Sequence, residues 1–277
     1  MSALLTLTQV SKSFGDLKAL DTIDLEINAG EVVGLVGSNG AGKTTLLRLM
    51  AGVYAPTAGT VLLADGNPVS KMRAALGVVP ESTGLYSRLT AWENIRYHSR
   101  MHGVPDKDAW ARTAKFAEHL DMVDSLGRHT KGFSRGMRQK TALMRALAHG
   151  PSILLLDEPT AGLDITSART VRKLVNQLKN EGGTVIYSTH QLAEAQQVCD
   201  RIVIVHNGEI RADGPPKQLL QETEASTLEE AYVALTRDTA RPRQEEDEKE
   251  GRFTGWWRSF FTPKPPTMPH QEVSSDE

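Results

Sequence analysis

The chain has 277 residues, with 32 basic and 34 acidic side chains, a formal net charge of -2 and 39% hydrophobic residues. This composition is typical of a globular protein, and the balanced charge predicts no nucleic-acid partner. The longest apolar runs are far shorter than the roughly 20 residues that cross a bilayer, which excludes an integral membrane protein. We expect no signal peptide, and the single cysteine, Cys199, allows no intrachain disulfide and fits a reducing compartment.

The N-terminal part of the chain is predicted to contain strands that lead into one helix. Apolar and polar residues alternate over 4–27, which indicates β-strands with a turn at 14–16. A short apolar strand over 31–37 follows. It runs through a glycine-rich loop into a helical pattern over 43–51.

Strands and helices then alternate through the rest of the chain. Further strands are predicted at 60–64, 76–80, 153–157, 184–189 and 201–206. Helices are predicted at 91–102, 107–120, 135–149, 166–180 and 191–198. Several of the strands are continuous apolar runs, which is typical of strands that are covered on both faces. We therefore expect an α/β fold with a largely parallel core sheet and a helical subdomain inserted over about 82–150.

The composition changes after about residue 220. A C-terminal helix is predicted within 221–240, over 227–236, and the charged segment 241–251 is predicted to be a linker. In the segment 252–277, five aromatic residues at helical spacing precede a Pro-rich polar tail that we expect to be disordered. The aromatic stripe fits a membrane- or partner-binding helix, or a helix packed on the chain's own domain.

Residues 37–44 read GSNGAGKT, which matches the phosphate-loop pattern G-x-x-x-x-G-K-[ST]. The glycines let successive backbone N–H groups point at phosphate oxygens, and the following helix presents its positive N-terminal end to the anion. Lys43 supplies a positive charge for the β- and γ-phosphates, and the Thr44 hydroxyl can bind Mg²⁺. The residues predicted to bind the nucleotide here are Ser38, Asn39, Gly40, Ala41, Gly42, Lys43, Thr44 and Thr45.

A second acidic element follows about 114 residues later, where the buried strand 153–157 ends in Asp157 and Glu158. The carboxyl end of a parallel strand faces the ligand crevice, so Asp157 is placed to hold Mg²⁺. Glu158 can orient or deprotonate an attacking water. Acidic residues before a proline also commonly end strands, but the pairing with the phosphate loop favours the catalytic interpretation.

Three more segments distinguish this chain from other proteins that have a phosphate loop. They read FSRGMRQ at 133–139, AGLD at 161–164 and STH at 188–190. Together with GSNGAGKT and LLLDEP, they resemble the nucleotide-binding subunits of ABC transporters in order and spacing over about residues 4–220. The resemblance implies an ABC ATP-binding domain over 1–220. Its fold would be that of a P-loop NTPase, with a RecA-like core, an antiparallel β subdomain and a helical signature subdomain.

The resemblance also implies roles around the chain's own ATP. Phe14 stands where the family stacks an aromatic ring on adenine, and His190 where it contacts the γ-phosphate. Glu158 matches the catalytic carboxylate, and Glu81 stands where the family usually has a Mg²⁺-binding Gln. Taken alone, Phe14 is better explained as a turn residue packed on the core, and His190 as an ordinary surface histidine.

Other roles concern a second subunit. The signature segment contains Ser134, Arg135, Gly136 and Met137, and in the family it contacts the γ-phosphate bound to the partner. Asp164 falls in a loop that communicates across that dimer. Ser134 and Asp164 are also suitable N-caps for the helices that follow them. The resemblance thus implies ATP and Mg²⁺ as ligands and a homo- or heterodimer as the assembly.

Two departures from the family pattern suggest a subgroup. The signature usually reads LSGGQ, and here it reads FSRGM, while Glu81 replaces the usual Gln. These features resemble ATPase subunits of ABC-2-type exporters, including sodium-extrusion and drug-resistance exporters. They imply a separate integral-membrane permease, gripped by residues 82–93, and a cytoplasmic location on the inner face of the membrane. An importer ATPase and a soluble ABC-type ATPase remain alternatives, whereas a P-loop kinase would lack the signature segment.

Overall fold

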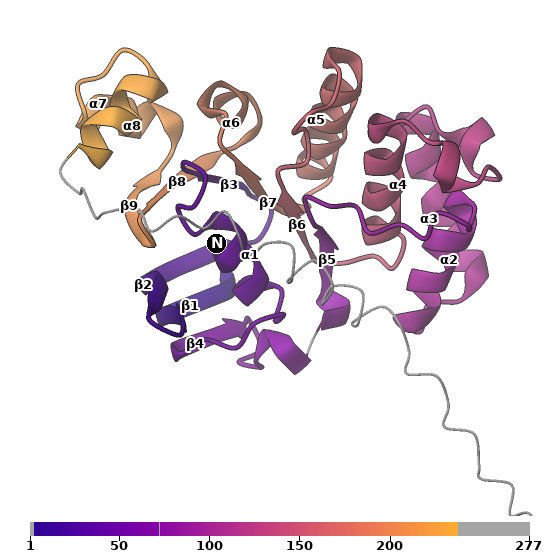
Figure 1. The fold of residues 1–277 in the computed structure, drawn as a ribbon, viewed down its shortest axis with the longest axis horizontal. Helices are drawn as coiled ribbons and strands as arrows, with labels where there is room; N and C mark the ends of the chain where they lie inside the picture. Colours follow the sequence, from indigo (N-terminus) through magenta and orange to yellow (C-terminus); the bar gives the residue numbers. More distant parts are fainter. Residues whose placement is uncertain (1–2, 72, 238–277) are drawn as a thin grey trace, which may run out of the picture. The chain divides into compact units, whose positions relative to one another are not determined.

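The fold is described from a computed structural model, which describes residues 3–71 and 73–237 (Figure 1). These residues belong to one compact unit, Met1–Arg241. The predicted linker over 241–251 and the predicted aromatic segment and tail over 252–277 lie outside the described residues. The last residues of the segment predicted over 221–240 also lie outside them.

The N-terminal strands form a three-stranded antiparallel sheet with the order β2-β1-β4. The strands are β1 (Ala3–Phe14), β2 (Leu17–Asn28) and β4 (Ala58–Leu63). Alternate residues of β1, such as Leu5 and Leu7, are buried, as expected of a sheet with one face against a core. This arrangement confirms the expected antiparallel β subdomain, although β4 begins two residues before the predicted 60–64.

The core is a six-stranded sheet with the order β5-β6-β7-β3-β8-β9. Its strands are β3 (Val32–Val36), β5 (Leu76–Val79), β6 (Ile153–Asp157), β7 (Thr184–Thr189), β8 (Arg201–His206) and β9 (Glu209–Gly214). Neighbouring strands from β5 to β8 are parallel, and β9 pairs antiparallel with β8. The predicted, largely parallel core sheet is therefore confirmed.

Both faces of the core sheet are covered, which explains the continuous apolar runs. In β3, Val33 and Leu35 pack in a cluster with α1 (Lys43–Met50) and the N-terminal sheet. Val32 and Val36, on the opposite face, pack in a second cluster with α5 (Ile165–Asn180) and α6 (Leu192–Val198). Because successive side chains of a strand point to opposite faces, a strand between two cores must be apolar throughout.

The helical subdomain lies beyond the β5 edge of the core sheet (Figure 1). It contains α2 (Ala91–Met101), α3 (Asp106–His119), α4 (Arg135–Leu147) and the 3-10 turns Val123–Ser125 and Thr130–Gly132. Helix α2 starts with a capping box. The Thr90 hydroxyl accepts from the Glu93 N–H, and the Glu93 carboxylate accepts from the Thr90 N–H. The expectation of a mostly helical stretch over 82–150 agrees with these elements.

Sequence analysis missed two elements, β9 and α7 (Pro216–Glu222), between β8 and the predicted last helix, α8 (Leu228–Thr236). The segment that forms β9 is mostly polar and half-buried, so it has no apolar run to mark it. The turn before it, Asn207-Gly208, has both residues at positive φ, the pattern of a two-residue hairpin. Two short 3-10 turns, Val69–Lys71 and Arg73–Ala75, were also not predicted.

Among the described residues, no helix is both long and apolar enough to cross a bilayer.

Replacing Ile186 by Ala should test the two-sided core. Ile186 lies in β7 and is 0% exposed, so its loss should lower the free energy of unfolding by about 2–5 kcal/mol. The matched control is Ile165→Ala at the start of α5, where the side chain is 86% exposed, and a change within about 0.5 kcal/mol is expected. Urea unfolding of both variants measures the difference, and equal effects would contradict this description of the core.

Candidate active site

The phosphate loop connects the buried strand β3 to helix α1, and its glycines are required by space and by backbone angle. A Cβ on Gly37 would collide with the Val205 carbonyl oxygen. Gly42 has φ 105°, and a Cβ there would lie 2.8 Å from a methyl of Leu20. Gly40 also has a positive φ. The tight loop predicted from residues 37–44 is therefore present, and Ser38, Asn39 and Ala41 lie within it.

Helix α1 begins at Lys43 without a side-chain cap, because its N-cap is Gly42. The first N–H groups of a helix have no partners within the helix, so they are available to an anion. Thr44 and Thr45 lie in this first turn. The geometry is that of an anion-binding helix N-terminus.

The Lys43 side chain is only 6% exposed and turns back over the loop. Its ammonium donates to the carbonyl oxygens of Gly37, at 2.8 Å, and Ser38, at 3.1 Å. It also lies 3.7 Å from Glu158 Oε1. Burial lowers the pKa of Lys43, and the Glu158 and Asp157 carboxylates partly oppose that shift. Phosphate oxygens could replace the two carbonyl oxygens as hydrogen-bond acceptors while the Lys43 ammonium stays where it is.

Asp157 ends strand β6 next to the first turn of α1. Its Oδ1 accepts a hydrogen bond from the Thr44 hydroxyl at 3.3 Å. Burial raises the pKa of Asp157, the Glu81 and Glu158 carboxylates add to the rise, and the Thr44 hydrogen bond opposes it. The Asp157 carboxylate is thus a buried anion with acidic neighbours and a hydroxyl beside it. These hard oxygen donors are the ones that Mg²⁺ prefers, so the residues fit the metal predicted here.

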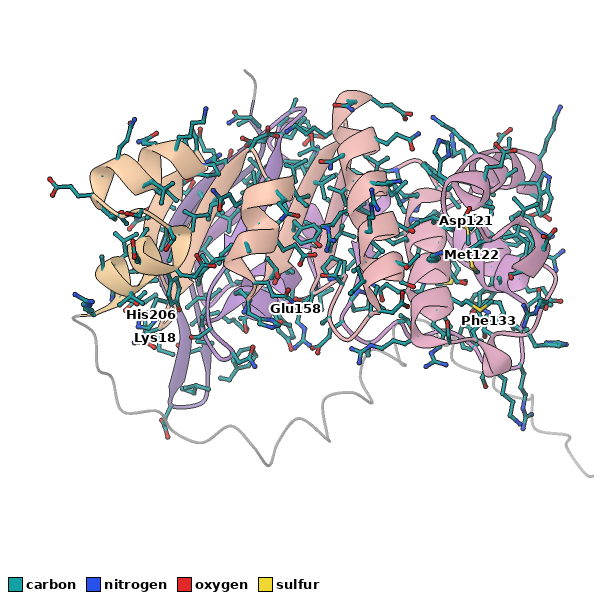
Figure 2. The ribbon with its side chains drawn as sticks, turned by 90° about the horizontal axis from the view of Figure 1, so that it is seen from above. Lys18, Asp121, Met122, Phe133, Glu158 and His206 are labelled. Carbon is teal, nitrogen blue, oxygen red and sulfur yellow. The ribbon has the colours of Figure 1, made fainter. Side chains whose placement is uncertain are left out.

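Glu158 occupies the centre of the site. Its backbone has φ 48°, an uncommon left-handed conformation for a residue with a side chain. Its N–H donates to the Ser188 carbonyl, which ties it to strand β7. One carboxylate oxygen lies near Lys43, and the other accepts from His190 Nδ1 at 2.9 Å. Figure 2 labels Glu158 between the N-terminal part of the fold and the helical subdomain, which contains Phe133.

The structure therefore brings together, at the ends of three adjacent parallel strands, the residues predicted to act in catalysis and phosphate binding. Lys43 and Thr44 follow β3, Asp157 and Glu158 end β6, and His190 follows β7. The carboxyl ends of parallel strands are the usual ligand-binding edge of such sheets. Glu81 comes two residues after β5, at the same edge, and is exposed. It acts on Asp157 and Lys43 through its charge.

Phe14 lies at the end of β1, with its ring half-buried. The ring packs edge-on against Tyr54, with centroids 5.3 Å apart, and the Lys12 ammonium lies 5.0 Å from the Phe14 centroid. These contacts agree with the packed-residue interpretation of Phe14. Its predicted contact with adenine stays a prediction.

The signature residues form a second group at the start of α4. Ser134 is the N-cap of α4 and accepts from the Met137 N–H at 3.2 Å, as its sequence position indicated. A Cβ on Gly136 would lie 2.5 Å from Ser167 Oγ, so a larger residue there would displace the Ser167 side chain. The Arg135 guanidinium packs over Gly162, a left-handed glycine in the loop after Glu158.

Asp164 caps helix α5, the second expected capping role. Its carboxylate accepts from Ser167 N–H at 2.9 Å and from Ser167 Oγ at 2.7 Å. These hydrogen bonds hold the pKa of Asp164 below its usual range. Within residues 3–71 and 73–237, no hydrogen bond or ion pair joins Ser134, Arg135, Gly136, Met137 or Asp164 to Lys43, Asp157, Glu158 or His190. One chain thus presents two separate groups of predicted ATP-binding residues.

Sequence analysis missed a buried residue that contacts the segments next to Glu158 and His190. Glu194 in α6 accepts hydrogen bonds from Thr160, at 2.8 Å, and Thr189, at 3.3 Å. It also forms a partly buried ion pair with Arg172 of α5 at 3.1 Å. Thr160 lies two residues after Glu158, and Thr189 precedes His190, so Glu194 fixes both loops. A glutamate in an amphipathic helix gives no sign of this role, because its partners are remote in sequence.

Sequence analysis also missed the contact of the phosphate loop with the last helix. The Ser38 N–H donates to the Tyr232 hydroxyl of α8 at 3.2 Å. The His206 ring lies edge-on to Tyr232, with centroids 6.4 Å apart. Helix α8 therefore supports the loop from outside the domain predicted over 1–220.

Replacing Glu194 by Gln should weaken the support of both loops. The change removes the charge that Arg172, Thr160 and Thr189 share, so the free energy of unfolding should fall by about 1.5–3 kcal/mol. The control is Glu181→Gln, which breaks an exposed pair with Lys115 and should cost no more than about 1 kcal/mol. Urea unfolding compares the two variants. Equal, small losses would show that Glu194 does not hold the loops.

Comparison with known proteins identifies the family. Residues 20–161 match the family described as ABC transporter. The chain is 40% identical to the ABC transporter ATP-binding protein NatA of Bacillus subtilis (strain 168), over 83% of this chain and 97% of that protein. It is 32% identical to the Nod factor export ATP-binding protein I of Cupriavidus metallidurans, over 91% of this chain and 85% of that protein.

Two further similarities bear on the transport direction and on the fold. The Fe(3+) ions import ATP-binding protein FbpC of Pasteurella multocida is 35% identical over 78% of this chain and 62% of that protein. A dimeric structure of a post-hydrolysis state of the ATP-binding cassette MJ0796, bound to ADP and Pi, superposes with a TM-score of 0.70. It is 26% identical and covers 76% of this chain and 98% of that chain. This chain therefore belongs to the ABC transporter ATP-binding family, and it is an ATP-hydrolysing enzyme.

Proposed function

We propose that this chain is the motor subunit of an ABC-2-type exporter, in which it powers a separate membrane permease by binding and hydrolysing ATP. The observation that carries the proposal is the position of Glu158, which lies 3.7 Å from the Lys43 ammonium and 2.9 Å from His190 Nδ1. The similarity to the Nod factor export protein supports export. The Arg135 and Glu81 departures from the family pattern point in the same direction.

The phosphates of ATP are proposed to bind over the loop 37–44. The loop N–H groups and the uncapped start of α1 donate to phosphate oxygens, and the Lys43 ammonium exchanges its two carbonyl acceptors for the β- and γ-phosphates. Thr44 and Asp157 are the residues proposed to hold Mg²⁺, with Glu81 beside them. When bound, Mg²⁺ neutralises charge on the phosphate oxygens. A cation there also compensates the buried charge of Asp157.

Glu158 is proposed to orient the attacking water and accept its proton. The water oxygen forms a bond to the γ-phosphorus as the bond to the ADP oxygen breaks. Lys43 stabilises the negative charge that spreads over the transferred group. His190 holds the Glu158 carboxylate through its Nδ1–H and is proposed to contact the γ-phosphate once ATP is bound. Phe14 is proposed to stack on the adenine ring.

The signature group is proposed to act on the ATP of a second subunit, either another copy of this chain or a related chain. Ser134, Gly136 and the N-terminus of α4 form an anion-binding surface, flanked by Arg135 and Met137, that would meet the γ-phosphate across the interface. Asp164 lies beside them at the start of α5. ATP thereby joins two subunits, and hydrolysis releases them.

The permease is proposed to grip residues 82–93, which holds the chain on the inner face of the membrane. The structure gives this segment a firm support. The Arg145 guanidinium donates to the carbonyls of Thr83, at 2.8 Å, and Gly84, at 3.0 Å. The Asn94 side chain accepts from the Tyr86 N–H and donates to the Tyr86 carbonyl. A backbone held in this way can pass a movement of the helical subdomain to a partner. Sodium or a drug is the proposed class of cargo.

Replacing Glu158 by Gln should leave ATP binding intact and slow hydrolysis by about 10²–10⁴-fold, because an amide cannot take the proton from water. The side chain keeps its shape, so the left-handed backbone and the loop should be unchanged. Phosphate release and nucleotide binding are measured on the same preparation, with Glu118→Gln, on the surface of α3, as the control. Unaltered turnover would overturn the assignment of Glu158.

The transport function is tested by purifying the full-length chain from detergent-solubilised native membranes and identifying the proteins that come with it. A stoichiometric multi-span permease of the ABC-2 type is the expected result. A permease that travels with a solute-binding protein would favour an importer instead. Recovery with ribosomes or DNA, and with no membrane protein, would overturn the transport proposal while leaving the ATPase assignment unaffected.

A further inference from the structure

Three histidines meet inside the helical subdomain, away from the residues assigned to ATP. His98 lies in α2, His102 is the C-cap residue one turn later, and His149 lies two residues after the end of α4. One ring nitrogen from each histidine lies within 4.8 Å of those of the other two. The rings of His102 and His149 are stacked with centroids 4.1 Å apart, and the His98 and His102 centroids are 4.6 Å apart.

The tautomer of His149 is determined by its hydrogen bond. Its Nε2 lies 3.1 Å from the carbonyl oxygen of Leu76 in β5, and because a carbonyl only accepts, Nε2 carries the proton. The lone pair is therefore on Nδ1, which is buried and has no hydrogen-bond partner among the described residues. A ring whose second nitrogen donates to a backbone carbonyl is the usual arrangement of a metal-binding histidine.

All three rings are in an environment that favours the neutral form, which is the form that binds a metal. Burial lowers the pKa of His98 to about 2 and that of His149 to about 4, and it also lowers the pKa of the half-buried His102. The charges that act on the rings are the guanidinium groups of Arg145 and Arg112. At His98 and His149 these positive charges add to the effect of burial, and they also weaken the binding of any cation.

We propose that His98, His102 and His149 bind a first-row transition-metal dication, such as Zn²⁺, which links helix α2 to the end of α4. Three imidazoles suit Zn²⁺, Cu²⁺ or Ni²⁺, whereas Mg²⁺ and Ca²⁺ prefer oxygen ligands. A Zn–N distance of about 2.0–2.1 Å requires the three nitrogens to move closer together. The stacked rings of His102 and His149 must also rotate apart, because a metal lies in the plane of each ring that binds it.

The site has a structural consequence for the segment 82–93. His98 neighbours Arg145, and Arg145 holds the Thr83 and Gly84 carbonyls. A metal that joins α2 to the end of α4 would stiffen the frame that carries this segment. Its effect on a permease rests on the proposed function, whereas metal binding itself is independent of that function.

The test uses the full-length chain, stripped of metal with a chelator and titrated with Zn²⁺ alone in a calorimeter. The expected result is one Zn²⁺ per chain, with a rise in the thermal midpoint. His102→Gln and His149→Gln should each weaken Zn²⁺ binding by at least about 10-fold. Even the loss of a residue that only hydrogen-bonds to a metal ligand has an effect of that size. The variants His119→Gln, on the surface of α3, and His190→Gln, in the active site, should bind as the unchanged chain does.

The outcomes distinguish binding at the three histidines from binding in the active site and from no binding. No Zn²⁺ binding, or binding that His102→Gln leaves unchanged, would overturn the proposal. Loss of binding in His190→Gln instead would assign the metal to the active site and would also overturn it. Circular dichroism of the metal-free variants checks folding, and the half-buried His102 decides the outcome if His149→Gln fails to fold. The absorption spectrum of the Co²⁺-loaded protein gives a second reading, because replacing a coordinating imidazole changes it.

Discussion

The Lys43 ammonium is buried at the start of α1, and the rest of the site depends on the groups that compensate for that burial. An ammonium taken out of water is stable only where polar groups and opposite charges replace the water. The carbonyl oxygens of Gly37 and Ser38 are the polar groups here, and the Glu158 carboxylate is the opposite charge. A carboxylate can reach Lys43 there because β3, β7 and β6 are neighbours in one parallel sheet and end at the same edge.

Three carboxylates, those of Glu81, Asp157 and Glu158, lie at this same edge of the sheet. Asp157 is a buried carboxylate with Glu81 and Glu158 as acidic neighbours, and Glu158 has a left-handed backbone. Glu194, paired with Arg172, accepts hydrogen bonds from Thr160, two residues after Glu158, and from Thr189, which precedes His190. The Lys43 ammonium, 3.7 Å from Glu158 Oε1, offsets part of this negative charge.

One chain holds only half of each proposed ATP site, and the helical subdomain explains why. The start of α4 is held within the chain by Arg135 on Gly162 and by Gly136 against Ser167. These contacts fix the signature group relative to α5, and Ser134 caps α4 by accepting from the Met137 N–H. The proposed contact with a partner's γ-phosphate would therefore use the other N–H groups of the first turn and the Ser134 hydroxyl hydrogen. The same helix carries Arg145 and leads to His149, which places the histidine cluster and the segment 82–93 on a common frame.

The sequence by itself determined the phosphate loop, the Asp157–Glu158 pair, the caps at Ser134 and Asp164, and the parallel character of the core, because each depends on residues close together in the chain. The Asn207-Gly208 turn, which has the composition of a two-residue hairpin, was the local sign of β9. Only the tertiary structure decided the strand order, the support by Glu194 and Tyr232, and the meeting of His98 with His149. Those contacts join residues that are far apart in sequence. A local sequence pattern cannot show which distant side chains meet when the elements pack together.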